Sequence, residues 1–323
     1  MTRALAIVGA VILVVQVAVW LPLHARRTET NMDWVVYRDA AENVLAGRPL
    51  YADCRPDPDR PPSCYLYPPP LAVALAPLAA LGSTAFQAGW YALLLVAFWV
   101  YAFALVRLSG REMSLVNVLA AGALVELAPG TSISMSFGNA NMLVWALCAL
   151  SLSGSATWAG IGAALKVYPC WAVLARRDRS TLVGMAAGAA VLGLSALAVG
   201  PGAFQQWGAA LRVLGPGVRI HGNVGLGIDL LRVAGLFGYH GAARGFLTAL
   251  PLMGVPAVIL ATRRLPRELA GALVLVAAVA LAPLCWWYYA PMLLMPAAAA
   301  LRGPVGVGER LRLRLRGAKV YAT

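Results

Sequence analysis

Charge is scarce in this sequence, and acids and histidines are scarcer still. Asp, Glu, Lys and Arg make up 12% of the 323 residues, whereas soluble domains carry about 25%. There are 13 acidic residues and three histidines, while 61% of the residues are hydrophobic. Because the lack of charge extends along the whole chain, it excludes a soluble protein with one anchor and indicates a polytopic membrane protein.

The five cysteines form no metal-binding pattern. No Cys-x-x-Cys pair and no His–Cys cluster occurs, so the sequence indicates no zinc site. Cys148, Cys170 and Cys285 lie within apolar runs and are interpreted as small buried hydrophobic residues. Cys54 and Cys64 share one polar loop and can form a disulfide if that loop is extracytoplasmic.

The net charge of +13 is concentrated in short basic clusters between the apolar runs. These clusters lie at 107–111, 176–179, 263–267 and 302–319. Cytoplasmic loops of membrane proteins carry such an excess of Lys and Arg, so the distribution indicates topology and argues against nucleic-acid binding. The basic tail, 304–323, is expected to contact anionic lipid head groups on the cytoplasmic side.

The apolar runs predict an all-α bundle with about eight full spans, since a crossing helix needs about 20 apolar residues. The predicted spans are 4–22, 84–107, 114–129, 139–153, 181–200, 242–261, 268–284 and 287–301. With Arg3 inside, both termini are cytoplasmic, and 23–83, 130–138 and 201–241 face outward. Residues 1–303 then form a single transmembrane domain in the plasma membrane, followed by the cytoplasmic tail.

The segment 156–175 needs a different arrangement, because a full crossing would place the basic cluster that follows it outside. Lys166 and Pro169 lie at its midpoint. Half-length helices that meet at a proline inside protein are an exception to full spanning. We therefore predict a re-entrant helical pair that enters the membrane and returns to the cytoplasmic side.

The stretch "NMDWVVYRDAAENVLAGRPLY" directly after the first span predicts a short extracytoplasmic surface helix. Asp33 lies in its first turn, Tyr37 lies on the same face four residues later, and Gly47 is suited to the C-cap. Asp33 could carry chemistry, or it could only interact favourably with the helix dipole.

Four other polar features have both a structural and a functional interpretation. Lys166 costs at least about 2.5 kcal/mol on insertion scales, so it either reaches the cytoplasmic face or binds an anion such as phosphate. Asn139 and Asn141 could cap a helix or line a cavity. Tyr67 and the aromatic run 286–289 could form an interfacial belt or contact a sugar ring. His221, Asn223 and nearby glycines share an outward loop.

Taken in order, these elements resemble glycosyltransferase family 87, a group of polytopic enzymes in the GT-C superfamily. "MDWVVYRDAAENVLAGRPLY" is similar to the family's Asp-x-x-x-Tyr, Gly and Tyr signature, through Asp33, Tyr37, Gly47 and Tyr51. "YLYPPPLAVALAPLAAL" is similar to its Tyr-x-Tyr-Pro-Pro element and the apolar run that follows.

The later motifs continue the resemblance with some departures. "FGNANML" corresponds to a Gly-Gln-x-Asn element with Asn139 in place of Gln, and "AGIGAALKVYP" to a Lys-x-x-Pro element. "HGNVGLGIDLLR" resembles an Asn-x-Ser segment with Gly225 in place of Ser. "LAPLCWWYYAPMLLMP" resembles a Ser-Pro-x-Ser-Trp-Asp-His element, in which Pro283 and Trp286 agree and tyrosines stand where the histidine is expected.

The resemblance implies a GT-C-like enzyme that transfers a sugar from a polyprenyl-phosphate donor with inversion, mannose being favoured over arabinofuranose. Asp33 would be the general base, and Lys166, His221, Asn223 and Arg38 are candidates for binding the donor phosphate. The remaining predicted donor-binding residues are Tyr37, Tyr67, Asn139, Asn141, Trp286 and Tyr288, of which Tyr67, Trp286 and Tyr288 could stack on sugar rings.

The predicted acceptor is a glycolipid or glycan at the extracytoplasmic face, and the other predicted partners are membrane lipids. No metal or other cofactor is expected. Two alternatives belong to other classes of protein: a lipid-linked sugar flippase or transporter, and a catalytically silent scaffold of a cell-envelope complex. A flippase would need charges that extend through both leaflets, and the sequence offers one clear mid-membrane cation, Lys166.

Overall fold

The computed structural model describes residues 1–26, 32–51, 64–176, 178–213, 226, 230, 243–282, 285 and 287–302. Within these ranges the chain is helical and contains no β-strand. The elements, in order, are α1 (Thr2–Val15), η1 (Gln16–Trp20), α2 (Leu21–His24), α3 (Asp33–Leu45), α4 (Pro69–Ala79), α5 (Ser83–Leu108), α6 (Leu115–Leu127), α7 (Thr131–Ser136), α8 (Asn141–Ser153), α9 (Thr157–Leu165), α10 (Cys170–Ala175), α11 (Ser180–Val199), α12 (Gly202–Val213), α14 (Ala243–Ala261), α15 (Arg267–Ala280), η2 (Trp287–Leu293) and α16 (Leu294–Leu301).

Among the described residues, three helical stretches are long and apolar enough to cross a membrane: Thr2–His24, Ser83–Leu108 and Ser180–Val199. Other apolar helices are shorter, and α6 and α8 have 13 residues each. At 1.5 Å per residue, such a helix is about 20 Å long, against a hydrocarbon core of about 30 Å. The chain is a helical membrane protein, but the count of eight full spans stays a prediction.

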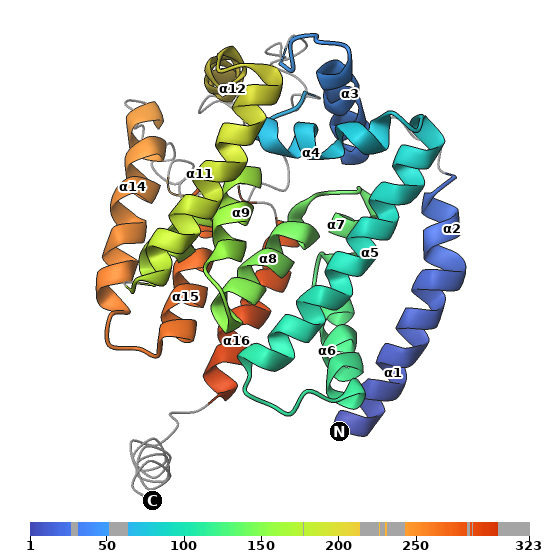
Figure 1. Ribbon diagram of the computed structural model, residues 1–323. Coiled ribbons are helices and arrows are strands. Elements are labelled where there is room, and N and C mark those ends of the chain that lie inside the picture. The colour runs from blue at the N-terminus through green and yellow to red at the C-terminus, as the bar shows by residue number, and fades with distance from the viewer. Residues whose placement is uncertain are drawn as a thin grey trace, which may run out of the picture.

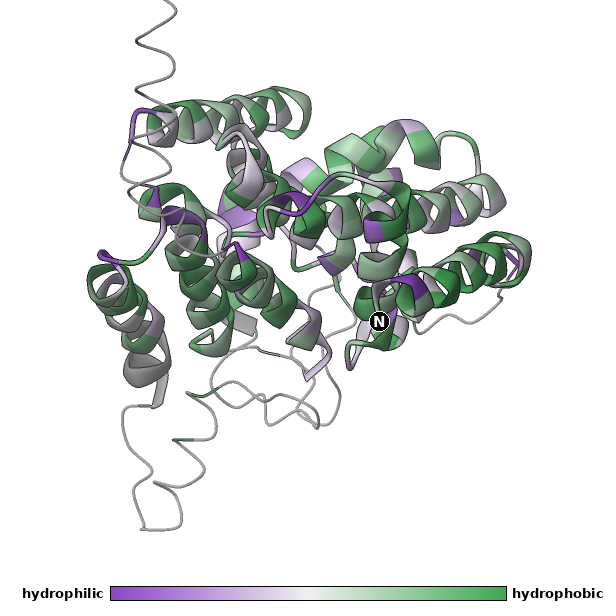
Figure 2. Cartoon of the chain, turned by 90° about the horizontal axis from the view of Figure 1, so that it is seen from below, coloured by the Kyte–Doolittle hydropathy of each residue, from purple (hydrophilic) through white to green (hydrophobic). Residues whose placement is uncertain are grey.

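The outer helices are apolar without being covered by protein. In each of the stretches that contain α1 and α11, only 17% of the most apolar 18-residue window is buried inside the protein. Figure 2 shows most of the helical ribbon in green, with the purple, hydrophilic segments gathered at helix ends, connections and the interior. An apolar surface of this extent suits contact with lipid chains.

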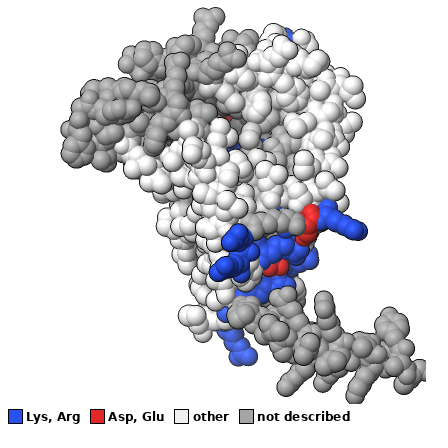
Figure 3. All heavy atoms as spheres, turned by 90° about the vertical axis from the view of Figure 1, so that its left-hand side faces the viewer, with Lys and Arg blue, Asp and Glu red and all other residues white. Residues whose placement is uncertain are grey.

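The basic clusters gather at one end of the bundle. The N-terminus and the end of α16 lie at the lower end of Figure 1, whereas α3, α4 and α12 lie at the upper end. Arg267 joins Asp178 at 2.9 Å, and Arg302 joins Glu268 at 3.1 Å. In Figure 3 the blue and red atoms are concentrated near this lower end, below a wide white band. The described residues of the clusters at 176–179 and 263–267 therefore lie together with Arg302.

Helices α9 and α10 form a hairpin that leaves this charged end and returns to it. Arg176, directly after α10, donates to the carbonyl oxygens of Ser151 at 2.5 Å and Gly154 at 2.8 Å, just before α9 begins. Both ends of the pair are thus joined, and its helices are interrupted at Lys166–Pro169. The hairpin agrees with the predicted helical pair, and its re-entry from the cytoplasmic side stays a prediction.

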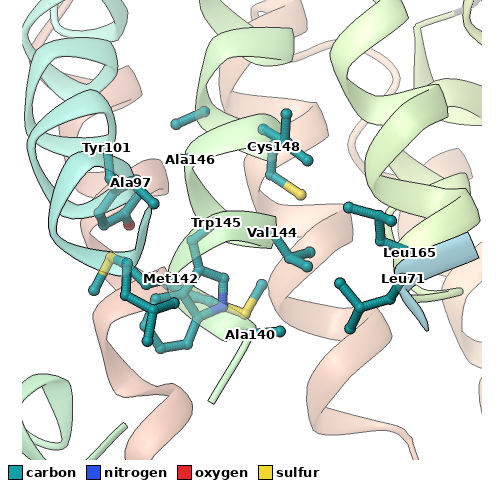
Figure 4. Close-up of a cluster of buried hydrophobic side chains, with 14 of the residues drawn as sticks. Leu71, Ala97, Tyr101, Ala140, Met142, Val144, Trp145, Ala146, Cys148 and Leu165 are labelled. Carbon is teal, nitrogen blue, oxygen red and sulfur yellow. The ribbon is translucent and has the colours of Figure 1, made fainter. Parts of the chain in front are cut away.

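The core is built around α5, α8 and α9. In Figure 4, Met142 and Trp145 of α8 lie beside Ala97 and Tyr101 of α5, and all four side chains are buried. Close packing of α9 on α11 depends on glycine, because a Cβ at Gly160 would lie 1.9 Å from the carbonyl oxygen of Gly184. This packing fixes the hairpin that carries Lys166.

Candidate active site

Helix α3 begins at Asp33, as predicted, and the chain ends the helix before Gly47, whose φ of +63° favours glycine. The Asp33 amide donates to the carbonyl oxygen of Phe137 at 2.9 Å, which attaches the first turn of α3 to the connection between α7 and α8. Trp34 and Tyr37 are buried beneath the helix. These contacts place the Asp33 carboxylate over that connection.

The α7–α8 connection is held in place by aromatic side chains of α5. Trp90 donates its indole N–H to the carbonyl oxygen of Gly138 at 2.8 Å, and Tyr91 donates to that of Ser136 at 3.0 Å. Gly138 has a φ of +69°, and a Cβ there would lie 3.0 Å from the Cβ of Trp34. A left-handed glycine with no room for a side chain thus precedes Asn139 and orients it.

Asn139 joins the carboxylate to the rest of the site. Its Nδ2 donates to Asp33 Oδ2 at 2.5 Å. Its Oδ1 accepts from the backbone N–H of Asn141 at 2.9 Å and from the Tyr67 hydroxyl at 3.3 Å. Asn139 thus accepts a hydrogen bond from the first residue of α8 and donates one to the candidate base, Asp33.

Lys166 lies at the other end of this hydrogen-bonded line. Its ammonium group donates to Asn141 Oδ1 at 2.5 Å, to the Tyr289 hydroxyl at 2.8 Å and to the Tyr67 hydroxyl at 3.1 Å. It also lies 4.8 Å from the ring centroid of Tyr67 and 5.0 Å from that of Tyr289. The side chain is directed toward α3 and not toward the basic end, and no carboxylate pairs with it among the described residues.

Tyr67 is positioned by the start of α4. Pro68 is the N-cap residue of this helix, and Pro69 and Pro70 are its first two residues. The carbonyl oxygen of Tyr67 accepts the Tyr51 hydroxyl at 2.8 Å, and that of Leu66 accepts the Trp207 indole N–H at 3.0 Å. The Tyr67 ring meets Tyr37 edge to face at 5.2 Å between centroids. Tyr67 is therefore a fixed bridge between Asn139 and Lys166.

The site is partly open. Asp33, Tyr67, Lys166 and Tyr288 are partly exposed, whereas Asn139 and Asn141 are buried. Figure 3 shows a recess in the white band in which red and blue atoms are visible. A substrate could thus reach the carboxylate and the ammonium while the amides between them remain packed in the protein.

The protonation of Asp33 depends on its burial and on two neighbours, Asn139 and Lys166. Burial raises the pKa of the Asp33 carboxyl above its usual range, while the Asn139 amide and the charge of Lys166 lower it in part. Arg38 is directed elsewhere: it pairs with Asp39 at 2.7 Å and donates to the Ser83 hydroxyl at 2.8 Å. The helix neighbour Glu42 lies 3.5 Å from the Arg38 guanidinium as well.

The structure adds one residue that the sequence analysis did not single out. Tyr289 contacts Lys166 directly, while the predicted Tyr288 stacks on Tyr289 at 5.6 Å between centroids. The signal available in the sequence was indirect: an intramembrane Lys needs several acceptors, and the run of tyrosines supplies hydroxyl groups.

Several predicted residues lie outside the described part of the chain, namely Cys54, His221, Asn223 and Trp286. Cys64 is disulfide-bonded, whereas Cys148, Cys170 and Cys285 are free. The described residues bring together no group of three His, Cys, Asp or Glu side chains that could hold a metal ion.

Comparison with protein families decides the class of the molecule. The sequence model of glycosyltransferase family 87 matches residues 65–301. The chain belongs to glycosyltransferase family 87. It is therefore a membrane glycosyltransferase, and the match includes Tyr67, Asn139, Lys166 and Tyr289, while Asp33 precedes it. No curated protein and no solved structure matches the chain.

Proposed function

We propose that this glycosyltransferase moves a sugar from a polyprenyl-phosphate donor to a hydroxyl group of a glycolipid or glycan, with inversion at the anomeric carbon. The observation that carries the proposal is the hydrogen-bonded line from Asp33 through Asn139 and Tyr67 to Lys166. It joins a carboxylate at one end of a partly open site to an ammonium group at the other, which has no carboxylate partner among the described residues.

In the proposed reaction, the acceptor oxygen attacks the anomeric carbon while the bond from that carbon to the phosphate oxygen breaks. The acceptor proton passes to the Asp33 carboxylate, and the bonding electron pair remains on the departing polyprenyl phosphate. Glycosyl phosphates already contain a good leaving group, so activation of the acceptor is the main task of a base. The raised pKa of Asp33 makes its carboxylate a stronger base than an ordinary surface aspartate.

Lys166 is proposed to bind the phosphate of the donor. Its three neighbours in the structure are an amide oxygen and two hydroxyl oxygens, none of which neutralises its charge. A phosphate oxygen could displace one hydroxyl and form a charge-assisted hydrogen bond, and the ammonium would then stabilise the charge that develops as the phosphate leaves. Tyr67 and Tyr288 are proposed to border the sugar.

The positive charge of Lys166 lets the proposed reaction proceed without a metal ion. Transfer is therefore expected to continue at an unchanged rate in excess EDTA, and a loss of rate restored by a divalent cation would contradict this part of the proposal.

The proposed sidedness follows the basic clusters. Because the described basic residues gather at the end opposite α3, the positive-inside rule supports a topology with Asp33 at the extracytoplasmic face of the plasma membrane and the termini in the cytoplasm.

The test is a transfer assay with the purified protein. Polyprenyl-phosphate mannose and polyprenyl-phosphate arabinofuranose are supplied separately with a membrane-lipid extract, and the product is identified by mass and by the NMR coupling of its anomeric proton. Mannosyl transfer with inverted configuration is expected. A product that retains the donor configuration would refute the single-displacement mechanism, and movement of intact donor across vesicle membranes without transfer would favour the flippase.

A further inference from the structure

A second polar site lies at the end of the bundle opposite Asp33. A cavity of about 130 Å³ opens between the end of α10, the end of α14 and the start of α15. It is lined by Ala175, Arg176, Ile259, Thr262, Arg263, Leu265, Arg267 and Ala270. None of these residues takes part in the candidate active site.

The cavity carries an excess of positive charge. Arg176 is 9% exposed. Among the described residues it donates to oxygens of Ser151 and Gly154 alone, and its buried Nε has no hydrogen-bond partner there. Arg263 has no carboxylate partner among the described residues. Arg267, by contrast, forms ion pairs with Asp178 at 2.9 Å and with Glu268 at 3.7 Å.

The size and lining of the cavity restrict what it can hold. The cavity of about 130 Å³ has room for a phosphate-sized group. Ile259, Leu265 and Ala270 add an apolar wall beside the arginines. In Figure 3, blue atoms surround red ones at this lower end, directly below the white band.

We propose that this cavity binds the phosphate group of an anionic membrane lipid. Arginine guanidinium groups bind phosphate through paired hydrogen bonds, and basic sites between helices at the cytoplasmic surface suit such head groups. The bound phosphate would hold α14 and α15 against Arg176. This arginine joins the two ends of the hairpin that carries Lys166. The site would therefore stabilise the arrangement of the bundle from the side remote from catalysis.

The test measures thermal unfolding of the purified full chain in neutral detergent by tryptophan fluorescence. The protein is titrated with phosphatidylglycerol, with phosphatidylcholine of the same acyl chains, and with inorganic phosphate alone. The variants are Arg263→Ala, which removes an exposed arginine of the cavity, and Arg264→Ala, which removes the adjacent exposed arginine that does not line it. Arg176 is left intact because it donates hydrogen bonds to Ser151 and Gly154, so its replacement would also destabilise the fold.

Phosphatidylglycerol is expected to raise the melting temperature, and phosphatidylcholine is not. The concentration of phosphatidylglycerol that gives half of the full shift should rise about tenfold in Arg263→Ala, because one hydrogen bond to a charged group is lost. In Arg264→Ala it should stay within about twofold of the wild-type value. Equal weakening in both variants, or no advantage of phosphatidylglycerol over phosphatidylcholine, would overturn the proposal. An equal shift with inorganic phosphate would assign the cavity to free phosphate and refute the lipid as its source. Because unfolding and not transfer is measured, the outcome is independent of the proposed reaction.

Discussion

Replacing Lys166 by methionine separates its proposed role in catalysis from its role in folding. The change keeps a long unbranched side chain but removes the ammonium that donates to Tyr67, Asn141 and Tyr289. Loss of one preorganised donor to a developing negative charge typically lowers kcat by about 10²- to 10³-fold, or about 2.7–4 kcal/mol. We expect a loss of that size in the rate of sugar transfer.

The same change should leave stability nearly unaltered, because two effects oppose each other. The buried Asn141 oxygen loses its charged partner, which costs about 1–3 kcal/mol. Removing a lysine from an intramembrane segment recovers at least about 2.5 kcal/mol on insertion scales. The free energy of unfolding is therefore expected to change by no more than about 1.5 kcal/mol.

Initial rates of transfer and thermal unfolding are measured on the same preparations. Arg179→Met is the control, since it removes an exposed cation at the basic end. A Lys166→Met protein that melts like the wild type and transfers sugar at more than a tenth of its rate would refute the phosphate-binding role. A large loss of stability with an unchanged rate per folded molecule would show that Lys166 is structural.

Three further predictions follow from contacts of the site. In Asn139→Ala, loss of the donor that favours ionised Asp33 should raise the pKa of this carboxyl further, so the acidic limb of the pH–rate profile moves to higher pH; a shift to lower pH would contradict this. Gly138→Ala and Gly47→Ala should each lower the free energy of unfolding by about 1–2 kcal/mol, because both glycines have a left-handed φ. Gly138→Ala alone of the two also brings a Cβ against Trp34, so it should melt at the lower temperature in a thermal scan; equal melting temperatures would argue against that close approach. Tyr289→Phe removes an acceptor from Lys166 and should slow transfer about tenfold, whereas Tyr288→Phe should not affect Lys166 directly; a larger effect of Tyr288→Phe on donor-phosphate binding, read from KM, would contradict the assignment.

Local elements were largely predictable from the sequence. The start of α3 at Asp33, the proline-led start of α4 and the interruption of the helical pair at Lys166–Pro169 follow from cap residues, prolines and charge distribution. These signals act over a few residues, so a single sequence reveals them. The number of spans did not follow in this way, because the ends of the shorter helices depend on packing against neighbours.

The contacts within the site depended on tertiary structure. Asn139 lies 106 residues from Asp33, and Lys166 lies 99 residues from Tyr67 and 123 from Tyr289, so no spacing rule could join them. The ordered resemblance to the family selected most of these residues without showing which of them touch. The choice between Tyr288 and Tyr289 depended on the 3-10 turn in which they lie, where Tyr101 donates to the carbonyl oxygen of Pro291 at 2.8 Å.

The prediction for Arg38 neglected competition within its own helix. Asp39 is the next residue and Glu42 lies four positions later, so both carboxylates are closer partners for this guanidinium than a donor phosphate in the site. That information was present in the sequence.

The most direct measurement compares the transfer rates of Asp33→Asn and Asp39→Asn. Asp39 is the matched control, because it is an exposed carboxylate on the same helix that pairs with Arg38. Burial raises the pKa of Asp33, so the folded protein loses stability as the pH rises through that pKa and the carboxyl ionises. Asn at this position carries no charge, so Asp33→Asn should melt at or above the wild-type temperature at neutral pH. Its transfer rate should fall by about 10²- to 10⁴-fold, the usual contribution of a general base, while Asp39→Asn stays near the wild-type rate. Wild-type turnover in folded Asp33→Asn would contradict the assignment of Asp33 as the catalytic base.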